Sequence, residues 1–271
     1  MTELITSVGF QKFENYNSPE KDILIEHFKT IPMMDKWIAC IVESYIYAYV
    51  EEYYNETDER SGNRKLKHKY RTKYGEKDGE YKVWHDNGQL SVQTTYVEDQ
   101  LQGEYKGWYN NGQLYIQSTY VEGKLHGEYK VWHDNGQIYI QSTYEEGELN
   151  GEYKEWWSDG KLCSQTTYVE GKRHGEYKMW NSDGKLWIQT TYASGKIHGE
   201  CKSWHDNGQL WEQTTYVEGE LHGECKYWHD NGQLWEQTTY VEGERHGDYK
   251  EWDGNGHLRL QTTYIEGKEI V

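Results

Sequence analysis

The segment that decides the fold runs GEYKVWHDNGQLSVQTTYVE over residues 79–98. It recurs to the end of the chain without an insertion or deletion, in eight copies with a period of 24 residues. Each copy opens with a glycine, from Gly79 to Gly247, and carries a tryptophan five residues later. A constant period of this length indicates a repeat architecture, in which each unit packs only on its neighbours.

Two turn signals divide each copy. Asn87-Gly88 is a strong hairpin signal, because both residues tolerate positive φ, and a second turn is expected at Glu-Gly pairs such as Glu122-Gly123. Two turns per copy leave two strands of about eight to ten residues. We therefore expect a mostly β fold, an elongated single-layer antiparallel meander of hairpins with about 16 strands and a span of about 75 Å. The structural glycines of the first turn are Gly88, Gly112, Gly136, Gly160, Gly184, Gly208 and Gly232.

Side-chain alternation then assigns the two faces of the sheet. If both turns are two-residue loops, Trp84 shares a face with residue 91, and Trp204 and Trp228 lie directly opposite Trp211 and Trp235. If the Asp-Asn-Gly turn contains a bulge, Trp84 instead joins Leu90. The sequence leaves both registers open. Residue 91 and its equivalents in later copies are Ser91, Tyr115, Tyr139, Cys163, Trp187, Trp211, Trp235 and Arg259.

Residues 1–78 differ from the repeats, which occupy residues 79–271, and predict a small α+β cap. Ser18-Pro19-Glu20 is a helix start, so we expect a short helix over about 19–29. Alternating tyrosine and β-branched residues predict a strand over about 38–54, and a second strand is expected over about 64–74.

The composition excludes several classes of partner. Mean hydropathy is -1.10, yet aromatic residues make up 15% of the chain, which favours a folded protein with a thin core over a disordered one. The net charge of -17 repels phosphate backbones and anionic lipid head groups, so we expect no nucleic-acid partner and consider a membrane unlikely on charge. No transmembrane segment or signal peptide is visible, which predicts an intracellular, soluble protein.

The residues that could carry chemistry all follow the repeat. Histidines and carboxylates recur once per copy with the same neighbours, whereas a metal site needs several ligands that converge on one point. We expect the histidines to bond or stack at turns. Cys201 and Cys225 occupy one column of adjacent copies, too far apart for a disulfide, and are expected to be free thiols. The sequence predicts no enzyme, no catalytic residue, no metal and no cofactor.

The aromatic columns are the candidate functional feature. They either pack within the sheet or form an exposed row that binds a partner. The second alternative is considered because tryptophan and tyrosine are common in binding hot spots. The candidate partner-binding residues are Tyr115, Tyr139, Trp187, Trp211, Trp235, Trp204 and Trp228.

The pattern G-E-Y-K-x-W-x-x-N-G-x-L, followed by Q-T-T-Y-V-E-G-K-x-H-G, resembles the MORN repeat, in the longer variant found in Marseillevirus-like large DNA viruses and in bacterial antitoxin-like proteins. The resemblance covers Gly79 to about Lys268. It implies a twisted antiparallel sheet of hairpins and a scaffold, dimerisation or protein-interaction role. It also implies a viral setting, with the infected host cytoplasm or the virion as the location.

The preferred hypothesis is a non-enzymatic scaffold that mediates protein–protein interaction or self-association through the aromatic sheet face. A second hypothesis is an aromatic ladder for carbohydrate or choline-like ligands, which uses ring stacking or cation–π contacts. A third is a peripheral membrane-associated MORN protein. The partner is accordingly expected to be another protein or a second copy of this chain.

Overall fold

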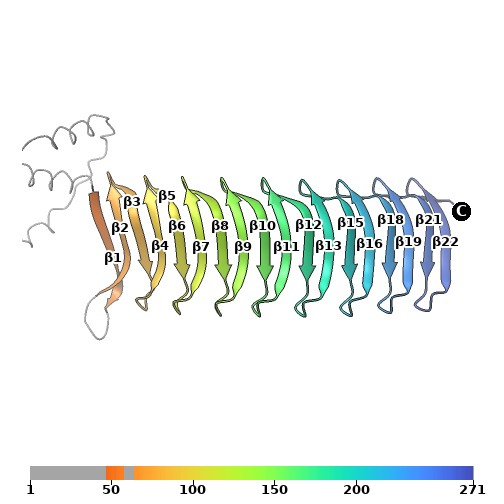
Figure 1. The fold of residues 1–271 in the computed structure, drawn as a ribbon, viewed down its shortest axis with the longest axis horizontal. Helices are drawn as coiled ribbons and strands as arrows, with labels where there is room; N and C mark the ends of the chain where they lie inside the picture. The colour runs from red at the N-terminus through yellow and green to blue at the C-terminus, as the bar shows by residue number, and fades with distance from the viewer. Residues whose placement is uncertain (1–46, 58–63, 271) are drawn as a thin grey trace, which may run out of the picture.

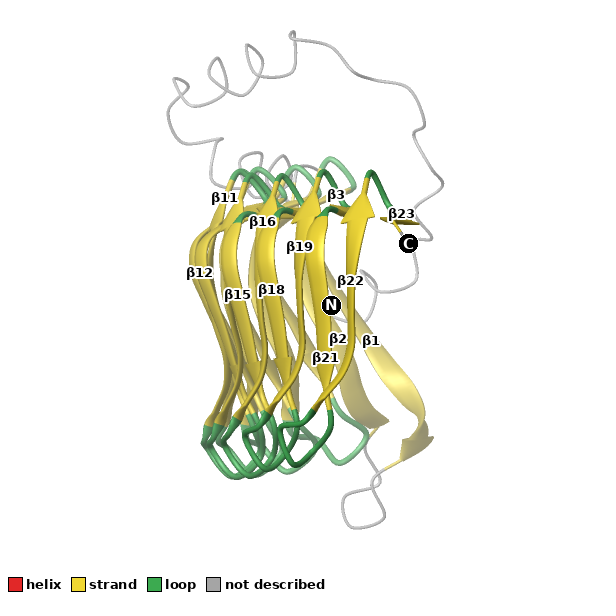
Figure 2. Cartoon of the chain, turned by 90° about the vertical axis from the view of Figure 1, so that its right-hand side faces the viewer, coloured by secondary structure: helices red, strands yellow, loops and turns green. Residues whose placement is uncertain are grey.

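A computed structural model describes residues 47–57 and 64–270. The described residues form one 23-stranded antiparallel sheet, whose strands lie side by side in chain order along the long axis (Figure 1). Seen along that axis, the sheet is a single layer with turns at both margins (Figure 2). This confirms the predicted fold class. The helix expected over residues 19–29 lies outside the described residues.

The sheet begins before the first repeat. The strands β1 (Tyr47–Thr57) and β2 (Arg64–Lys73) pair with each other, and β2 pairs with β3 (Glu76–Trp84) of the first repeat. The described part of residues 1–78 therefore extends the meander by one hairpin, and the α+β cap expected there is not supported. Of the strand expected over residues 38–54, only the part from Tyr47 onward is described, and this strand continues to Thr57.

Each repeat is a hairpin of two strands. The first strand is continuous in β3, β8 (Lys124–Trp132), β10 (Glu148–Trp156) and β12 (Lys172–Trp180). In the other repeats it is split into β5 (Gln100–Leu101) and β6 (Gly103–Trp108), β14 (Lys196–Ile197) and β15 (Gly199–Trp204), β17 (Glu220–Leu221) and β18 (Gly223–Trp228), and β20 (Glu244–Arg245) and β21 (Gly247–Trp252).

The second strands have a constant length of eight residues, and a short final strand follows the last of them. They are β4 (Leu90–Val97), β7 (Leu114–Val121), β9 (Ile138–Glu145), β11 (Leu162–Val169), β13 (Leu186–Ala193), β16 (Leu210–Val217), β19 (Leu234–Val241) and β22 (Leu258–Ile265), with β23 (Lys268–Ile270) at the end.

The Asp-Asn-Gly turn is a three-residue loop, closed by a 2.8 Å bond from His85 N to Gln89 O. Gly88 has a φ of 84°, but Asn87 does not have positive φ, so the predicted two-residue turn is wrong. The side chain of Asn87 accepts a bond from the Gln89 N–H instead. All seven predicted turn glycines have positive φ, namely Gly88, Gly112, Gly136, Gly160, Gly184, Gly208 and Gly232.

The three-residue loop would shift the register by one residue, and a bulge at residue 91 cancels that shift. Trp84 pairs with Leu90, whereas Val83 pairs with Val92 and Tyr81 with Thr94. The bulge alternative is therefore right at the turn, but the strand body keeps the register of a two-residue loop. Trp204 and Trp228 pair with Leu210 and Leu234, so they do not lie opposite Trp211 and Trp235 as expected.

The second turn is a two-residue loop as expected, and both of its residues have positive φ. Glu122 has a φ of 49° and Gly123 a φ of 77°, the combination that a type I′ turn requires. Gly123 N also donates to Leu101 O of the preceding repeat at 2.9 Å. The turns of neighbouring repeats are thereby linked by backbone bonds.

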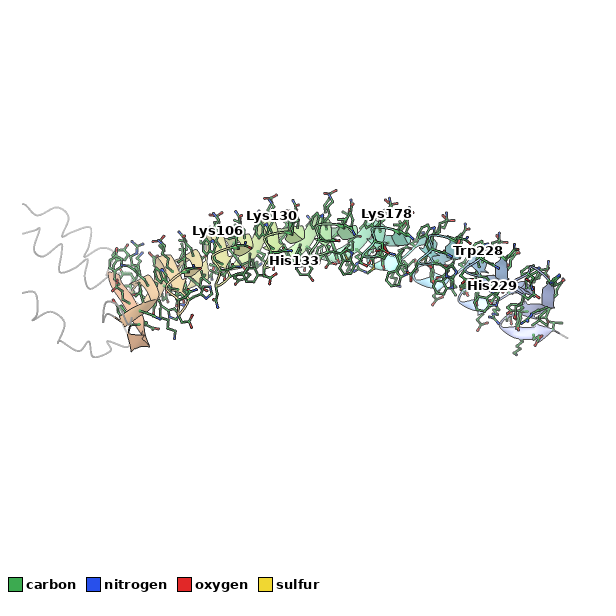
Figure 3. All side chains as sticks on the ribbon, turned by 90° about the horizontal axis from the view of Figure 1, so that it is seen from below. Lys106, Lys130, His133, Lys178, Trp228 and His229 are labelled. Carbon is green, nitrogen blue, oxygen red and sulfur yellow. The ribbon has the colours of Figure 1, made fainter. Side chains whose placement is uncertain are left out.

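The two faces of the sheet differ in chemistry and curvature. We call the face with Tyr81, Tyr96 and their equivalents the tyrosine face, and the face with Lys82, Trp84 and their equivalents the lysine face. The sheet is bowed, and the labelled lysines Lys106, Lys130 and Lys178 stand on its convex side (Figure 3). Because side chains alternate along a strand, the tyrosine face is the concave one.

Candidate binding face

Paired tyrosines form the centre of the tyrosine face. In six hairpins a tyrosine of the first strand meets one of the second strand edge to face, with ring centroids 5.3 to 6.0 Å apart. Such contacts add to the stability gained from burial of the rings. The pairs are Tyr81–Tyr96, Tyr105–Tyr120, Tyr129–Tyr144, Tyr153–Tyr168, Tyr177–Tyr192 and Tyr249–Tyr264.

A column of small hydroxyl residues is buried beneath these rings. Ser118, for example, pairs with Tyr105 on one side and Tyr129 on the other, and its side chain is 1% exposed. A residue of this size lets the large rings on both sides close over it. The column consists of Thr94, Ser118, Ser142, Thr166, Thr190, Thr214 and Thr238, and it is the nearest this single layer has to a core.

Each repeat has this bulge, and it turns the side chain of residue 91, or of its equivalent in a later repeat, toward the tyrosine face. Tyr115 covers Gly107, where an added Cβ would lie 2.5 Å from the Tyr115 ring. The Tyr227 ring lies between Trp211 and Trp235, with ring centroids 6.5 and 6.3 Å away. Gly107 and Tyr227 belong to the column of Val83, which is on this face.

Four of these residues are exposed at the surface. The exposed fractions are 40% for Tyr139, 44% for Trp187, 41% for Trp211 and 39% for Trp235, whereas Tyr115 is half-buried. Histidines of the turns support several of them, for example His133 beside Tyr139 with ring centroids 4.8 Å apart. Five of the seven predicted partner-binding residues thus form one row on the concave face.

The other two candidates lie apart from this row. Trp204 and Trp228 follow Ser203 and Tyr227 in the strand and therefore point to the lysine face, where both are half-buried. Figure 3 shows Trp228 on the same side of the sheet as the labelled lysines. The structure separates the predicted binding residues between the two faces, with the exposed aromatic row on only one of them.

In the C-terminal half, glutamates lie on the tyrosine face, a feature that the repeat pattern alone does not predict. Where the early repeats place Val92 and Ile116, the later ones place Glu212 and Glu236. Glu212 accepts bonds from Ser203 Oγ at 3.1 Å and Thr214 Oγ1 at 3.4 Å. The sequence shows a change from apolar to acidic residues at this position of the repeat. Only the structure shows that these glutamates lie on the tyrosine face.

Two arginines also lie on the tyrosine face. The Arg173 guanidinium lies over the rings of Tyr177 and Tyr192, at 4.9 and 5.4 Å from the ring centroids. Arg245 lies over Tyr249 and Tyr264 at 4.8 and 5.6 Å. These contacts have the geometry of cation–π interactions.

Burial raises the pKa of tyrosine hydroxyls and cysteine thiols on this face. It raises the pKa of the Tyr249 hydroxyl to about 12, with the nearby Glu236 carboxylate as a second cause. Burial also raises the pKa of the Cys225 thiol to about 11, and it raises the pKa values of the Cys163 and Cys201 thiols. Cys163, Cys201 and Cys225 are free, as expected for the latter two.

The lysine face is a ladder of ion pairs. Lys82 Nζ lies 2.6 Å from Glu80 Oε1, and the same pairing of residues two apart recurs in every repeat. Gln93 Nε2 donates to Glu80 across the hairpin at 3.1 Å. A lysine hydrogen bond lowers the pKa of Glu176 and of Glu200. The charges of this face are largely matched internally.

Neighbouring turns are also joined by side chains. His85 Nε2 lies 2.7 Å from Trp108 O of the next repeat, and His133, His205 and His229 repeat this contact. All four histidines thus bond at turns, and His133, His205 and His229 also contact an aromatic ring, as predicted. Within the described ranges, no group of three or more His, Cys, Asp or Glu residues is placed to hold a metal ion. Among the same residues, no helix is long and apolar enough to cross a bilayer.

Comparison with known proteins identifies the repeat. The model of a family described as "MORN repeat variant" matches eight consecutive segments, namely residues 77–98, 101–122, 125–146, 149–170, 173–194, 197–218, 221–242 and 245–266. A comparison with curated proteins finds no match.

Solved structures show only a partial likeness. The crystal structures of TcdB2-TccC3 and TcdB2-TccC3-Cdc42 share 10% and 11% sequence identity with this chain, with TM-scores of 0.19 and 0.17. The matches cover 82% and 79% of this chain and 15% and 14% of those chains. A likeness of this extent carries no argument about function.

Proposed function

This chain belongs to the MORN repeat variant family, and we propose that it is a non-enzymatic scaffold that binds a protein through its tyrosine face. The family match and the open meander make it a repeat scaffold; the interaction role is the proposal. The observation that carries it is the exposed row of Tyr139, Trp187, Trp211 and Trp235 on one face.

Physical chemistry favours this face over the other. Large aromatic side chains exposed on consecutive repeats, as Trp187, Trp211 and Trp235 are, are unfavourable in water and are typical of interaction surfaces. The lysine face instead presents matched ion pairs, which contribute little to association. A concave sheet also offers a partner more contact area than a flat one. The partner is either a different protein or a second copy of this chain.

A paired-variant capture experiment tests the proposal. The variant W187S/W211S/W235S removes the aromatic row from repeats five, six and seven, and the control K178S/K202S/K226S changes the lysine face of the same repeats. Two readouts are compared: the capture of partner proteins from cells in which the chain is expressed, and self-association measured by light scattering. Whichever of the two the wild type shows should be lost with the first variant and kept with the control. Retained association with the first variant, or equal loss with both, contradicts the proposal. Circular dichroism checks that both variants fold.

A ligand-binding ladder is the second candidate, and one observation favours it. The Tyr227 ring contacts the Trp211 and Trp235 rings, and Tyr227 pairs with Glu212 on the neighbouring strand. Aromatic rings near a carboxylate suit a cation such as choline. Calorimetric titration with choline and with oligosaccharides distinguishes this function from protein binding. Nothing in the described residues favours the membrane alternative, and the net charge of -17 opposes it.

A further inference from the structure

We propose that the tyrosine face of repeats six and seven binds an arginine side chain of a partner protein, with Glu212 as the carboxylate and Trp211, Tyr227 and Trp235 as the aromatic surround. This inference rests on the proposed scaffold function and specifies the chemistry of its partner. The partner segment is basic and lies against the concave face.

Strand pairing brings the four residues together. Tyr227 of β18 pairs with Glu212 of β16 on one side and with Glu236 of β19 on the other. Trp211 and Trp235 precede these glutamates in their strands, and their rings flank the Tyr227 ring edge to face, with interplanar angles of 63° and 68°. The result is an aromatic surface with a carboxylate on each side.

The neighbouring repeat shows how this face holds a guanidinium group. Arg245 Nη2 lies 3.3 Å from Glu236 Oε1, and Arg245 Nε donates to the Tyr240 hydroxyl at 3.3 Å. The guanidinium also lies over the Tyr249 and Tyr264 rings. A carboxylate, a tyrosine hydroxyl and ring faces therefore surround one internal arginine.

Repeat six has the same carboxylate without the arginine. Glu212 corresponds to Glu236, but the residue that corresponds to Arg245 is Leu221. Over the described ranges, Glu212 forms hydrogen bonds with Ser203 and Thr214 and no ion pair with a lysine, arginine or histidine. Tyr216 stands where Tyr240 stands, so the hydroxyl partner is also present. Of the two rings under Arg245, Tyr264 has its equivalent in Tyr240, whereas Cys225 stands in the place of Tyr249. Repeat six therefore lacks the cation and one of these two rings, and the Tyr227, Trp211 and Trp235 rings lie close by.

A cation from outside the chain would complete this arrangement. Glu212 is half-buried among aromatic rings, where a carboxylate without a counter-charge is costly and a charge-assisted hydrogen bond is strong. Arginine suits the place better than lysine, because its planar group can stack on rings while it donates to a carboxylate. The net charge of -17 attracts a basic segment over longer distances.

Fluorescence anisotropy with dye-labelled peptides tests the inference. The probe is a Gly/Ser peptide with two arginines, and its twin carries citrulline, which has the same shape without the charge. At physiological ionic strength, Glu212→Gln should weaken arginine-peptide binding at least about tenfold. The control Glu218→Gln, which removes the same charge from an exposed turn of the same repeat, should change binding by less than about twofold. The citrulline peptide should bind wild type as weakly as the arginine peptide binds E212Q.

A second variant tests the internal precedent directly. Leu221→Arg gives repeat six the arginine that repeat seven has, so its own guanidinium should take the place of the probe and weaken binding at least about tenfold. Equal binding of the two peptides to wild type, or unchanged binding with E212Q and L221R, overturns the inference. Choline that displaces the peptide at equal concentration also overturns it, because the site would then be one for small free cations.

Failure of this inference is distinguishable from failure of the proposed function. If the triple tryptophan variant abolishes partner capture while E212Q leaves peptide binding unchanged, the scaffold function stands and the arginine site falls. If E212Q acts as expected while the triple variant leaves capture unchanged, the face binds arginine but is not the surface that carries the scaffold function.

Discussion

Each threonine or serine buried under the tyrosine rings has to accommodate a hydroxyl in a dry place. Thr166 Oγ1 has no hydrogen-bond partner among the described residues, whereas Thr214 Oγ1 donates to Glu212 Oε1. The two residues occupy the same position of the repeat and are both buried, but only the Thr214 hydroxyl forms a hydrogen bond.

Thr166→Val is therefore expected to raise the free energy of unfolding by about 1 kcal/mol, since it removes an unsatisfied buried polar atom at constant shape. Urea denaturation followed by circular dichroism measures the change. The matched variant Thr214→Val should not stabilise, because it takes a donor from Glu212. Stabilisation by T214V equal to that by T166V would show that the Glu212 contact is unimportant.

The Cys225 thiol makes stability depend on pH in the alkaline range. Burial raises its pKa from 9.0 to about 11, so the folded protein holds this proton more tightly than the unfolded chain does. Below about pH 9 the stabilising contribution is present in full, and it is lost as the pH rises toward 11.

The free energy of unfolding should accordingly fall between pH 9 and 11, by at most about 3 kcal/mol from this residue. Cys225→Ala should show a shallower fall over the same interval, whatever its stability at neutral pH. Parallel slopes for both proteins in urea titrations at several pH values would rule out this source of the pH dependence.

At the scale of elements, the turns form a stack that is held by side chains. Asn135 Nδ2 donates to Ser158 O of the next turn at 2.7 Å. In the following repeat Asp159 replaces the asparagine and has no donor, and Lys161 Nζ instead donates to Ser182 O at 2.8 Å. Asn-Gly-Gln and Asp-Gly-Lys are thus two ways to supply a side-chain donor to a backbone carbonyl of the next turn.

Asn135→Asp should destabilise the protein by about 1 kcal/mol, because it keeps the acceptor for the Gln137 N–H but loses the bond to Ser158. Adding Gln137→Lys should restore most of the loss, as in repeats four and five. A double-mutant cycle by urea denaturation measures this coupling. Purely additive effects of the two substitutions would contradict the inter-turn bond.

The hairpins follow from local signals in the sequence, whereas the face of each second-strand residue does not. The period and the Gly88 and Gly123 turn signals predict the hairpin meander correctly, because they report local backbone requirements. They fail on the face of Trp211, because Asn87 uses its side chain for hydrogen bonds and the resulting one-residue shift is cancelled by a bulge. No periodic signal marks such a pair of compensating shifts.

At the scale of the whole molecule, the meander is one bowed layer with unlike faces. Its stability comes from contacts between neighbouring repeats, as in other solenoids. The candidate binding row was predictable in part, since five of its residues were identified from one column. The role of Glu212 was not, because its lack of a cation becomes visible only when Leu221 and Arg245 are placed on the same face.

We propose that association uses the concave tyrosine face. Hydroxyl-radical footprinting of the chain, free and in its associated state, tests this proposal, because one measurement reports both faces residue by residue. We expect Trp187, Trp211 and Trp235 to lose labelling on association, while Trp204 and Trp228 on the lysine face keep theirs. Protection of Trp204 and Trp228 with unchanged labelling of the concave row would show that association uses the lysine face instead.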